Sequence, residues 1–367
     1  MPKRKVSSRT KVVVGMSGGV DSSLAAALLK EDGYDVIGMT FRMWPKEECG
    51  DSSRRACCSL EAVTRARAVS EDLGIPYYVV DFSGDFKKHV IDYFCSEYLK
   101  GLTPNPCVIC NQKIKFGSLL DKARSLGASY VATGHYARLG RDGSSGRYLL
   151  REGADKSKDQ SYFLFNLSQA QLRHALFPLG GLTKAKVRQL AKKMKLRTYD
   201  TVSSQDICFV RDRKYAEYIE KKTGVEMKPG EIVDKAGKVI GSHKGIASYT
   251  IGQRRGLGIA HNEPLYVTAL DIGNNRVVAG VRADLDKRTV IADRFNWISV
   301  KHLEKPARVT AKIRYNHKKA KALAADIGCG KVRVDFDEPQ SAPTPGQALV
   351  LYNKDIVIGG GWISSAN

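Results

Sequence analysis

Two parts of the chain combine residue types that could carry out chemistry. The first, Gly15 to Ser23 (GMSGGVDSS), joins a short apolar run to a run of strong helix formers. Glycines let backbone N–H groups approach a ligand closely, and such groups at a helix N-terminus form an anion site. A tight strand-to-helix turn with Ser22 as N-cap would use the same residues. Because the loop carries Asp21 and lacks the lysine of the mononucleotide P-loop, it indicates a phosphate site of a different kind.

The second part is defined by cysteines. Cys107 and Cys110 form the only CxxC pair in the chain, within Thr103 to Asn111 (TPNPCVICN), where two prolines predict a loop between helices. The spacing suits a redox dithiol or two metal ligands, although a structural zinc would require a second pair. Cys208, far downstream, is a third candidate, although a single cysteine is more often a small buried hydrophobe.

The elements that would position these residues alternate in the first half of the chain. Strands are predicted at 12–14, 35–41, 76–81 and 130–133, and helices at 22–30, 59–73, 85–100 and 114–126. This alternation predicts an α/β domain with a parallel sheet covered on both faces. Ligands of such sheets bind at the carboxyl ends of the strands, where the glycine-rich loop would lie.

The second half of the chain follows a different pattern. From about Val210, glycines separate short β-prone runs, which predict a small β-rich domain. From about Val277, strand-like runs at 289–291, 308–313, 331–336 and 348–352 predict a C-terminal barrel or sandwich. We therefore expect three domains, at 1–209, 210–276 and 277–367.

The charge balance narrows the class of partner. The 60 Lys and Arg residues exceed the 38 Asp and Glu residues and leave a formal net charge of +22. A soluble basic protein with no polyanionic partner is one reading, but the recurrence of basic residues along the chain favours nucleic acid. No apolar run is long enough for a membrane span, and no secretory signal follows the basic N-terminus, so we expect a cytoplasmic protein.

The motifs together resemble a known family. The loop at Gly15 resembles the SGGxDS loop of the PP-loop ATP pyrophosphatase superfamily, which binds the pyrophosphate of ATP and releases it on adenylating a substrate. Further segments are similar to those of bacterial tRNA-specific 2-thiouridylases, in the same order along the chain: TPNPCVICNQKIKF from Thr103, ATGHYAR from Ala132, KDQSYFL from Lys158, SSQDICFV from Ser203, YTIGQRRGLG from Tyr249, IRYNH from Ile313 and GQALVLY from Gly346.

The resemblance implies a reaction in which ATP activates the C2 oxygen of the wobble uridine of Glu, Gln and Lys tRNAs, and sulfur then replaces that oxygen. It implies Mg²⁺ near Asp21 and ATP bound by the following residues: Gly15, Met16, Ser17, Gly18, Gly19, Val20, Asp21, Ser22, Met39 and Gly134. It also implies a partner that supplies sulfur, such as a cysteine desulfurase or a sulfur relay protein.

The family resemblance also implies roles for the cysteines and the tRNA contacts. Cys110 would be the nucleophile and Cys208 the carrier of a persulfide, with a transient disulfide between them. Asn105, Pro106 and Cys107 would meet the target base. The remaining tRNA contacts implied are His135, Lys158, Asp159, Gln160, Arg314, Tyr315 and Gln347.

One departure from the family leaves an alternative open. Many members have Asp where this chain has Cys107, and a thiol does not duplicate a carboxylate acid/base. Cys107, Cys110 and Cys208 could instead hold a [4Fe-4S] cluster, because thiolates are the usual cluster ligands. Two rival functions also remain: a synthetase-type PP-loop enzyme, which would leave the cysteines unexplained, and a non-catalytic RNA-binding protein, which would leave the loop unexplained.

Overall fold

The computed structural model describes residues 10–43, 59–201, 207–210 and 214–367. The chain divides into two compact units. The first unit comprises Met1–Val90, Cys107–Phe209 and the short segment Asp355–Val357, and the second comprises Ile91–Pro106, Val210–Lys354 and Ile358–Asn367. Both units are therefore assembled from segments that are distant in the sequence.

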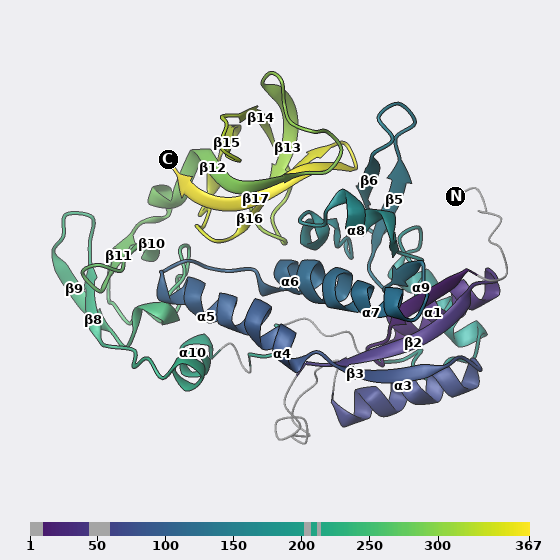
Figure 1. Ribbon diagram of the computed structural model, residues 1–367. Helices are drawn as coiled ribbons and strands as arrows, with labels where there is room; N and C mark the ends of the chain where they lie inside the picture. Colours follow the sequence, from purple (N-terminus) through teal and green to yellow (C-terminus); the bar gives the residue numbers. More distant parts are fainter. Residues whose placement is uncertain (1–9, 44–58, 202–206, 211–213) are drawn as a thin grey trace. The chain divides into compact units, whose positions relative to one another are not determined.

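The first unit contains the parallel sheet that the alternating pattern predicts (Figure 1). Its five strands are β1 (Lys11–Gly15), β2 (Asp35–Arg42), β3 (Tyr77–Asp81), β4 (Tyr130–Ala132) and β7 (Ala175–Leu176). They lie in the order β3-β2-β1-β4-β7, and each neighbouring pair is parallel. The three valines of β1 are fully buried because a central parallel strand is covered on both faces. The predicted α/β sheet is confirmed.

Helices cover both faces of this sheet. The helices α1 (Val20–Glu31), α3 (Leu60–Asp72) and α9 (Lys184–Lys193) share one apolar core with Val12 and Val14 of β1. Figure 1 shows α3 and α7 on opposite sides of the strands, and α7 packs against β4. The alanine-rich sequence of α1 lets this helix lie close to the sheet, because its small side chains are almost completely buried.

The CxxC pair lies in a helix, so the predicted loop is confined to residues 102–105 and the prediction was wrong for the two cysteines. Helical structure begins with α6 (Pro106–Ile109) and continues through a π-helical segment (Cys110–Ser118) into α7 (Leu119–Ser125). A proline is compatible with the first position of a helix, because the N–H group that it lacks would have no partner there. Helical backbone therefore positions both thiols, and the wider π turn begins at Cys110.

The predicted helix at 85–100 also contains a π turn. It consists of α4 (Ser83–Phe86), a π-helical segment (Lys87–Ile91) and α5 (Asp92–Leu99). Between β4 and β7 the structure adds elements that the sequence pattern did not predict: the antiparallel hairpin of β5 (Ala137–Arg141) and β6 (Tyr148–Glu152), a 3₁₀ turn (Ser161–Leu164) and α8 (Gln169–Arg173).

The second unit includes the predicted small β-rich part. This β-rich part is preceded by α10 (Tyr215–Thr223), a helix that was not predicted and that ends at Gly224 in a left-handed conformation. Four strands follow in the order β10-β11-β8-β9. Their bounds are β8 (Gly230–Val233), β9 (Val239–His243), β10 (Tyr266–Asp271) and β11 (Arg276–Gly280).

The C-terminal strands of the second unit form a closed barrel, which confirms the prediction of a barrel or sandwich (Figure 1). The order is β12-β15-β14-β13-β16-β17, and pairing of β12 with β17 closes the ring. The bounds are β12 (Asp286–Trp297), β13 (Ala307–Lys312), β14 (Ala320–Asp326), β15 (Val332–Ser341), β16 (Ala348–Asn353) and β17 (Ile356–Ala366). Within the described ranges no helix is long and apolar enough to cross a membrane.

Candidate phosphate and thiol site

The glycine-rich loop lies where the strand order of the parallel sheet reverses. β1 is flanked by β2 on one side and β4 on the other, and the loop leaves the carboxyl end of β1 to enter α1. Gly15 is paired with Met39 of β2, and Val14 with Ala132 at the end of β4. Ligands of open α/β sheets bind at such a reversal point, so the fold places the loop at the expected binding position.

Two glycines of this region are required by close backbone contacts. Gly18 has φ +70°, and a side-chain Cβ there would lie 2.9 Å from Ala62 Cα and overlap the Ala62 carbonyl oxygen. Gly134, just beyond β4, would bring a Cβ within 2.8 Å of the backbone carbon of Asp21. Both positions therefore exclude a side chain, and the loop is held against α3 on one side and the end of β4 on the other.

Hydroxyl groups hold the loop in shape. The Ser17 N–H donates to Ser22 Oγ at 3.1 Å, and Ser22 Oγ donates to the Gly19 carbonyl at 3.1 Å. The Val20 N–H donates to Thr201 Oγ1 at 3.0 Å, a contact that no local motif predicts. Gly19 is the N-cap of α1, and its position has no side-chain capping hydrogen bond. Apart from the Val20 N–H, the N–H groups at the start of α1 can therefore donate to a bound anion.

Asp21 lies in the first turn of α1 and has two strong partners. Lys184 Nζ lies 2.6 and 2.7 Å from its two carboxylate oxygens, and the Tyr136 hydroxyl donates to Oδ1 at 2.7 Å. Burial raises the pKa of Tyr136, and the adjacent Asp21 carboxylate raises it further. Sequence reasoning missed Lys184, which belongs to no recognisable motif, and gave no role to Tyr136, although this residue lies within the ATGHYAR segment.

Met39, predicted beside the adenine at the end of the second strand, is fully buried within β2, which continues to Arg42. Its carbonyl accepts a hydrogen bond from the Met16 N–H at 2.8 Å, and Thr40 Oγ1 donates to the Met16 carbonyl at 2.6 Å. These bonds fix the first residues of the loop to β2. The predicted ATP-binding residues from Gly15 to Ser22, Met39 and Gly134 thus belong to one connected part of the first unit.

The three candidate cysteines all belong to the first unit. Cys110 is buried, whereas Cys107 and Cys208 are exposed. Although Cys107 is accessible, crowding by protein atoms raises the pKa of its thiol, and the nearby Lys115 acts in the opposite direction. The residues 202–206, which precede Cys208 in its predicted motif, lie outside the described part of the chain.

The residue after the predicted nucleophile has a special environment. Asn111 is buried, and its Nδ2 donates to the Phe163 carbonyl at 3.1 Å. Its Oδ1 has no hydrogen-bond partner among the described residues. In the same part of the chain, no group of three or more His, Cys, Asp or Glu side chains could hold a metal ion. As the described residues lie, the three cysteines are thus not gathered in the arrangement that the [4Fe-4S] hypothesis requires.

Two predicted tRNA contacts of the first unit are buried. His135 Nδ1 lies 2.5 Å from Thr133 Oγ1, and desolvation together with Lys115 holds its pKa well below the usual histidine value. Asp159 accepts hydrogen bonds from the N–H groups of Gly153 and Ser161 at 2.9 and 3.1 Å, and burial raises its pKa. Asp159 therefore holds the backbone around it, whereas His135 contacts the side chain of Thr133.

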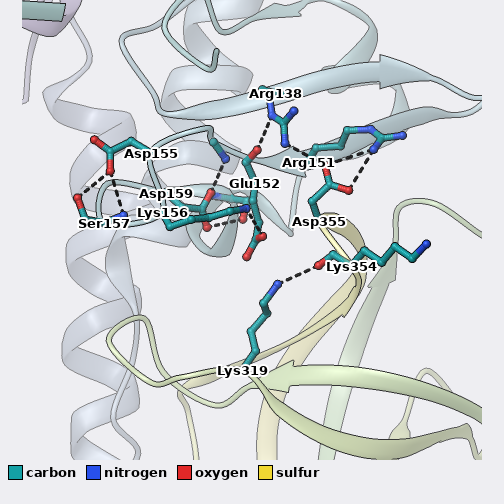
Figure 2. Close-up of polar contacts among 12 residues, drawn as sticks. Arg138, Arg151, Glu152, Asp155, Lys156, Ser157, Asp159, Lys319, Lys354 and Asp355 are labelled. Atoms are coloured by element: carbon teal, nitrogen blue, oxygen red, sulfur yellow. Dashed lines mark hydrogen bonds and ion pairs between the residues drawn. The ribbon is translucent and has the colours of Figure 1, made fainter. Parts of the chain in front are cut away.

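The neighbouring residues form a polar network around the β5–β6 hairpin (Figure 2). Lys156 Nζ pairs with Glu152 Oε2 at 2.6 Å, and Arg138 pairs with Asp355 at 2.9 Å. Gln160 Oε1 accepts the Tyr136 N–H at 3.0 Å, which ties the predicted Lys158–Gln160 contact segment to the phosphate site. Lys158 follows the turn that begins at Asp155 and is half-buried.

The remaining predicted tRNA contacts and two of the three predicted base contacts lie in the second unit. The Arg314 guanidinium donates to the carbonyls of Ile251 and Ala342 at 3.1 and 2.5 Å, and Lys312 lies over the ring of Tyr315 at 5.7 Å. Gln347 Nε2 donates to the Thr103 carbonyl at 2.9 Å, which holds the segment leading to the buried residues Asn105 and Pro106. The chain passes from the second unit to the first between Pro106 and Cys107, so the three predicted base contacts are divided between the units.

Comparisons with known protein families match the α/β part of the chain and the two β-rich parts that follow it. Three family models match consecutive parts of the chain: a tRNA methyl transferase HUP domain at residues 10–212, a tRNA methyl transferase PRC-barrel domain at 216–281 and an aminomethyltransferase beta-barrel domain at 287–363.

Curated relatives match nearly the whole chain. A tRNA-specific 2-thiouridylase MnmA from Acetivibrio thermocellus is 51% identical over 97% of this chain and 99% of its own length. The proteins of the same name from Moorella thermoacetica and Clostridioides difficile are 51% and 49% identical, over 96% and 97% of this chain and 99% and 98% of their own lengths. With this identity over almost its full length, the chain belongs to the family of tRNA-specific 2-thiouridylases.

Proposed function

We propose that the protein is a tRNA-uridine 2-sulfurtransferase that adenylates the C2 oxygen of the wobble uridine and replaces it with sulfur from a cysteine persulfide. The observation that carries this proposal is a glycine-rich anion site at the strand-order reversal, in the same compact unit as Cys110 and Cys208. We further propose the division of labour expected from the sequence: catalysis in 1–209, a small central domain in 210–276, and a tRNA-binding barrel in 277–367.

The first step is activation of the uridine by ATP. The C2 oxygen attacks the α-phosphorus of ATP, a new P–O bond forms, and pyrophosphate leaves with the electrons of the bond that breaks. The loop amides between Gly15 and Ser22 and the α1 N-terminus would stabilise the charge that develops on the departing pyrophosphate. Mg²⁺ near Asp21 would neutralise part of the same charge. Met39 and Gly134 would line the nucleotide.

The second step is sulfur transfer. The terminal sulfur of the Cys208 persulfide attacks C2, and AMP departs with the former C2 oxygen. The Cys110 thiolate then attacks the inner sulfur of Cys208 and breaks the bond between the two persulfide sulfurs, which leaves 2-thiouridine on the tRNA. The product is a Cys110–Cys208 disulfide, and a thiol reductant must supply two electrons to restore the enzyme. The exposure of Cys208 supports its role as the site that an external sulfur donor loads.

The proposed binding of tRNA relies on charge and on a base that leaves its stack. A net charge of +22 supports contacts with the phosphate backbone, whose affinity depends on salt. Asn105, Pro106 and Cys107 would meet the flipped uridine, as base-modifying enzymes require. His135, Gln160, Arg314, Tyr315 and Gln347 would support tRNA binding, some of them by shaping the backbone that meets it. We place the reaction in the cytoplasm with a cysteine desulfurase or a relay protein as donor.

The proposal is tested by following both products. Purified protein, ATP and unmodified Glu, Gln or Lys tRNA should release pyrophosphate only when all three are present, and a persulfide donor should then yield 2-thiouridine on digestion of the tRNA. Asp21→Ala should abolish pyrophosphate release while tRNA affinity stays within a few-fold. Pyrophosphate release that does not require tRNA would instead favour a synthetase-type enzyme, and an absence of release in any combination would refute the ATP step.

A further inference from the structure

Lys184 lies at the phosphate loop although it is far from the loop in the sequence. Its Nζ is 2.6 and 2.7 Å from the two carboxylate oxygens of Asp21 and 5.8 Å from the centre of the Tyr136 ring. The loop itself contains no lysine, unlike the mononucleotide P-loop, in which a lysine reaches the β- and γ-phosphates. The fold thus brings a cation to this loop from the start of α9, the helix that packs beside α1.

We propose that Lys184 is the residue that binds the β- and γ-phosphates of ATP, in the place of a lysine within the loop. This inference rests on the proposed function, because it assigns the ligand of the same site. In the nucleotide-free protein Asp21 holds the ammonium group beside the loop. When ATP enters, the ammonium group turns toward the phosphates and releases the carboxylate of Asp21.

The backbone of Lys184 is fixed, whereas its head group is accessible. The Lys184 N–H donates to Asp155 Oδ2 at 2.9 Å, and Thr183 caps the helix by accepting the Lys186 N–H at 3.2 Å. The side chain of Lys184 is 14% exposed and that of Asp21 is 29% exposed, so a ligand can reach the pair. An ammonium group has three donors, and Asp21 occupies two of them, which leaves a donor for an incoming phosphate.

A purely structural role for the pair is less consistent with its surroundings. The contact between α1 and α9 is already made by apolar side chains, among them Val187 and Ala191, which are fully buried. A partly exposed ion pair adds little to such a contact because water screens it. The same pair next to a phosphate-binding loop has a clear use, since a cation there offsets the charge of the pyrophosphate portion.

The test compares two nucleotides that differ in their phosphates. Binding of AMP and of an ATP analogue with a methylene group between the α- and β-phosphorus is measured by calorimetry for the wild type and for Lys184→Met. A lost charge-assisted hydrogen bond weakens binding by about 10- to 100-fold, so we expect this loss for the ATP analogue. AMP lacks the β- and γ-phosphates, so its affinity should stay within about two-fold.

Two further variants control the comparison. Lys186→Met removes an exposed lysine of the same helix, whose Nζ contacts Gln189 Oε1 at 2.9 Å, and should leave both affinities unchanged. Lys184→Arg keeps the charge and should recover most of the lost affinity for the ATP analogue. Equal losses for AMP and the analogue in Lys184→Met, or no loss for either, would overturn the assignment. Failure of the wild type itself to bind the analogue would overturn the proposed ATP site, and this result is distinct because it appears before any substitution.

Discussion

Substitution of two adjacent glycines of the phosphate loop should separate a structural requirement from a ligand-binding one. Gly18 has a left-handed backbone with φ +70°, and an alanine Cβ there would lie 2.9 Å from Ala62 Cα. Gly19 has φ −101°, and the nearest atom to an alanine Cβ would be Ser17 Oγ at 3.6 Å, an ordinary contact. The two variants add the same methyl group to the same loop in very different surroundings.

The magnitudes follow from these contacts. In Gly18→Ala, a left-handed conformation costs an alanine about 1–2 kcal/mol. Overlap with backbone atoms of α3, which cannot rotate away, costs about 1–3 kcal/mol more, so the free energy of unfolding should fall by about 2–5 kcal/mol in total. In Gly19→Ala, the loss of a favoured N-cap residue costs about 1 kcal/mol at most. For a domain of this size, each kcal/mol corresponds to about 2–4 °C in the melting temperature.

Thermal unfolding followed by circular dichroism should therefore show a decrease of roughly 4–20 °C for Gly18→Ala and less than about 4 °C for Gly19→Ala. Calorimetric titration with the ATP analogue, at a temperature where both variants are folded, should show a larger loss of affinity for Gly19→Ala than for Gly18→Ala. Apart from its chain neighbours, Ser17 Oγ is the only atom of the described residues within 4 Å of a Gly19 methyl. The methyl would therefore occupy open space beside the proposed phosphate-binding amides, and Gly19→Ala should bind the analogue at least about ten-fold more weakly. A wild-type melting temperature for Gly18→Ala, or wild-type affinity for Gly19→Ala, would refute the corresponding part of the reasoning.

Three other predictions concern the thiols, the charge and a buried histidine. Cys208→Ser and Cys110→Ser should each abolish formation of 2-thiouridine while pyrophosphate release is retained. Only Cys208→Ser should lose the sulfane sulfur that a desulfurase loads onto the protein. The control Cys329→Ser, which changes an exposed cysteine of the second unit, should stay active. The tRNA affinity should fall steeply with salt, with a log–log slope of about −0.7 to −0.9 per phosphate contacted, and a flat response would separate the +22 charge from RNA binding. The pKa of His135 is depressed in the folded protein, so the unfolded state takes up a proton near pH 6.5 that the folded state does not. The free energy of unfolding should therefore fall as the pH drops below about 6.5. In His135→Gln this fall should be smaller.

Local sequence patterns predicted those elements whose own residues determine their structure. The run Val12–Val14 forms a central strand because three consecutive apolar residues suit a strand buried on both faces. The helix predicted at 59–73 forms as α3, and Ser59 caps it by accepting the Ala62 N–H at 3.2 Å. Elements with contrary local preferences were missed. β14 consists of the helix-forming sequence AKALAAD, and it is a strand because the barrel supplies partners on both edges.

Motifs identified the candidate chemistry, because a glycine-rich loop and a CxxC pair carry their meaning in a few adjacent residues. The sequence alone determined the phosphate loop, the thiols and, through its segments, the family. Only the tertiary structure decided what surrounds them: that Pro106 starts a helix carrying both cysteines, that Asp21 is bound by Tyr136 and Lys184, and that Gly134 is glycine because Asp21 packs on it. Asp21 is separated from each of its partners by more than a hundred residues. Local sequence spacing cannot predict these contacts, because they form only when α9 and the end of β4 pack beside α1.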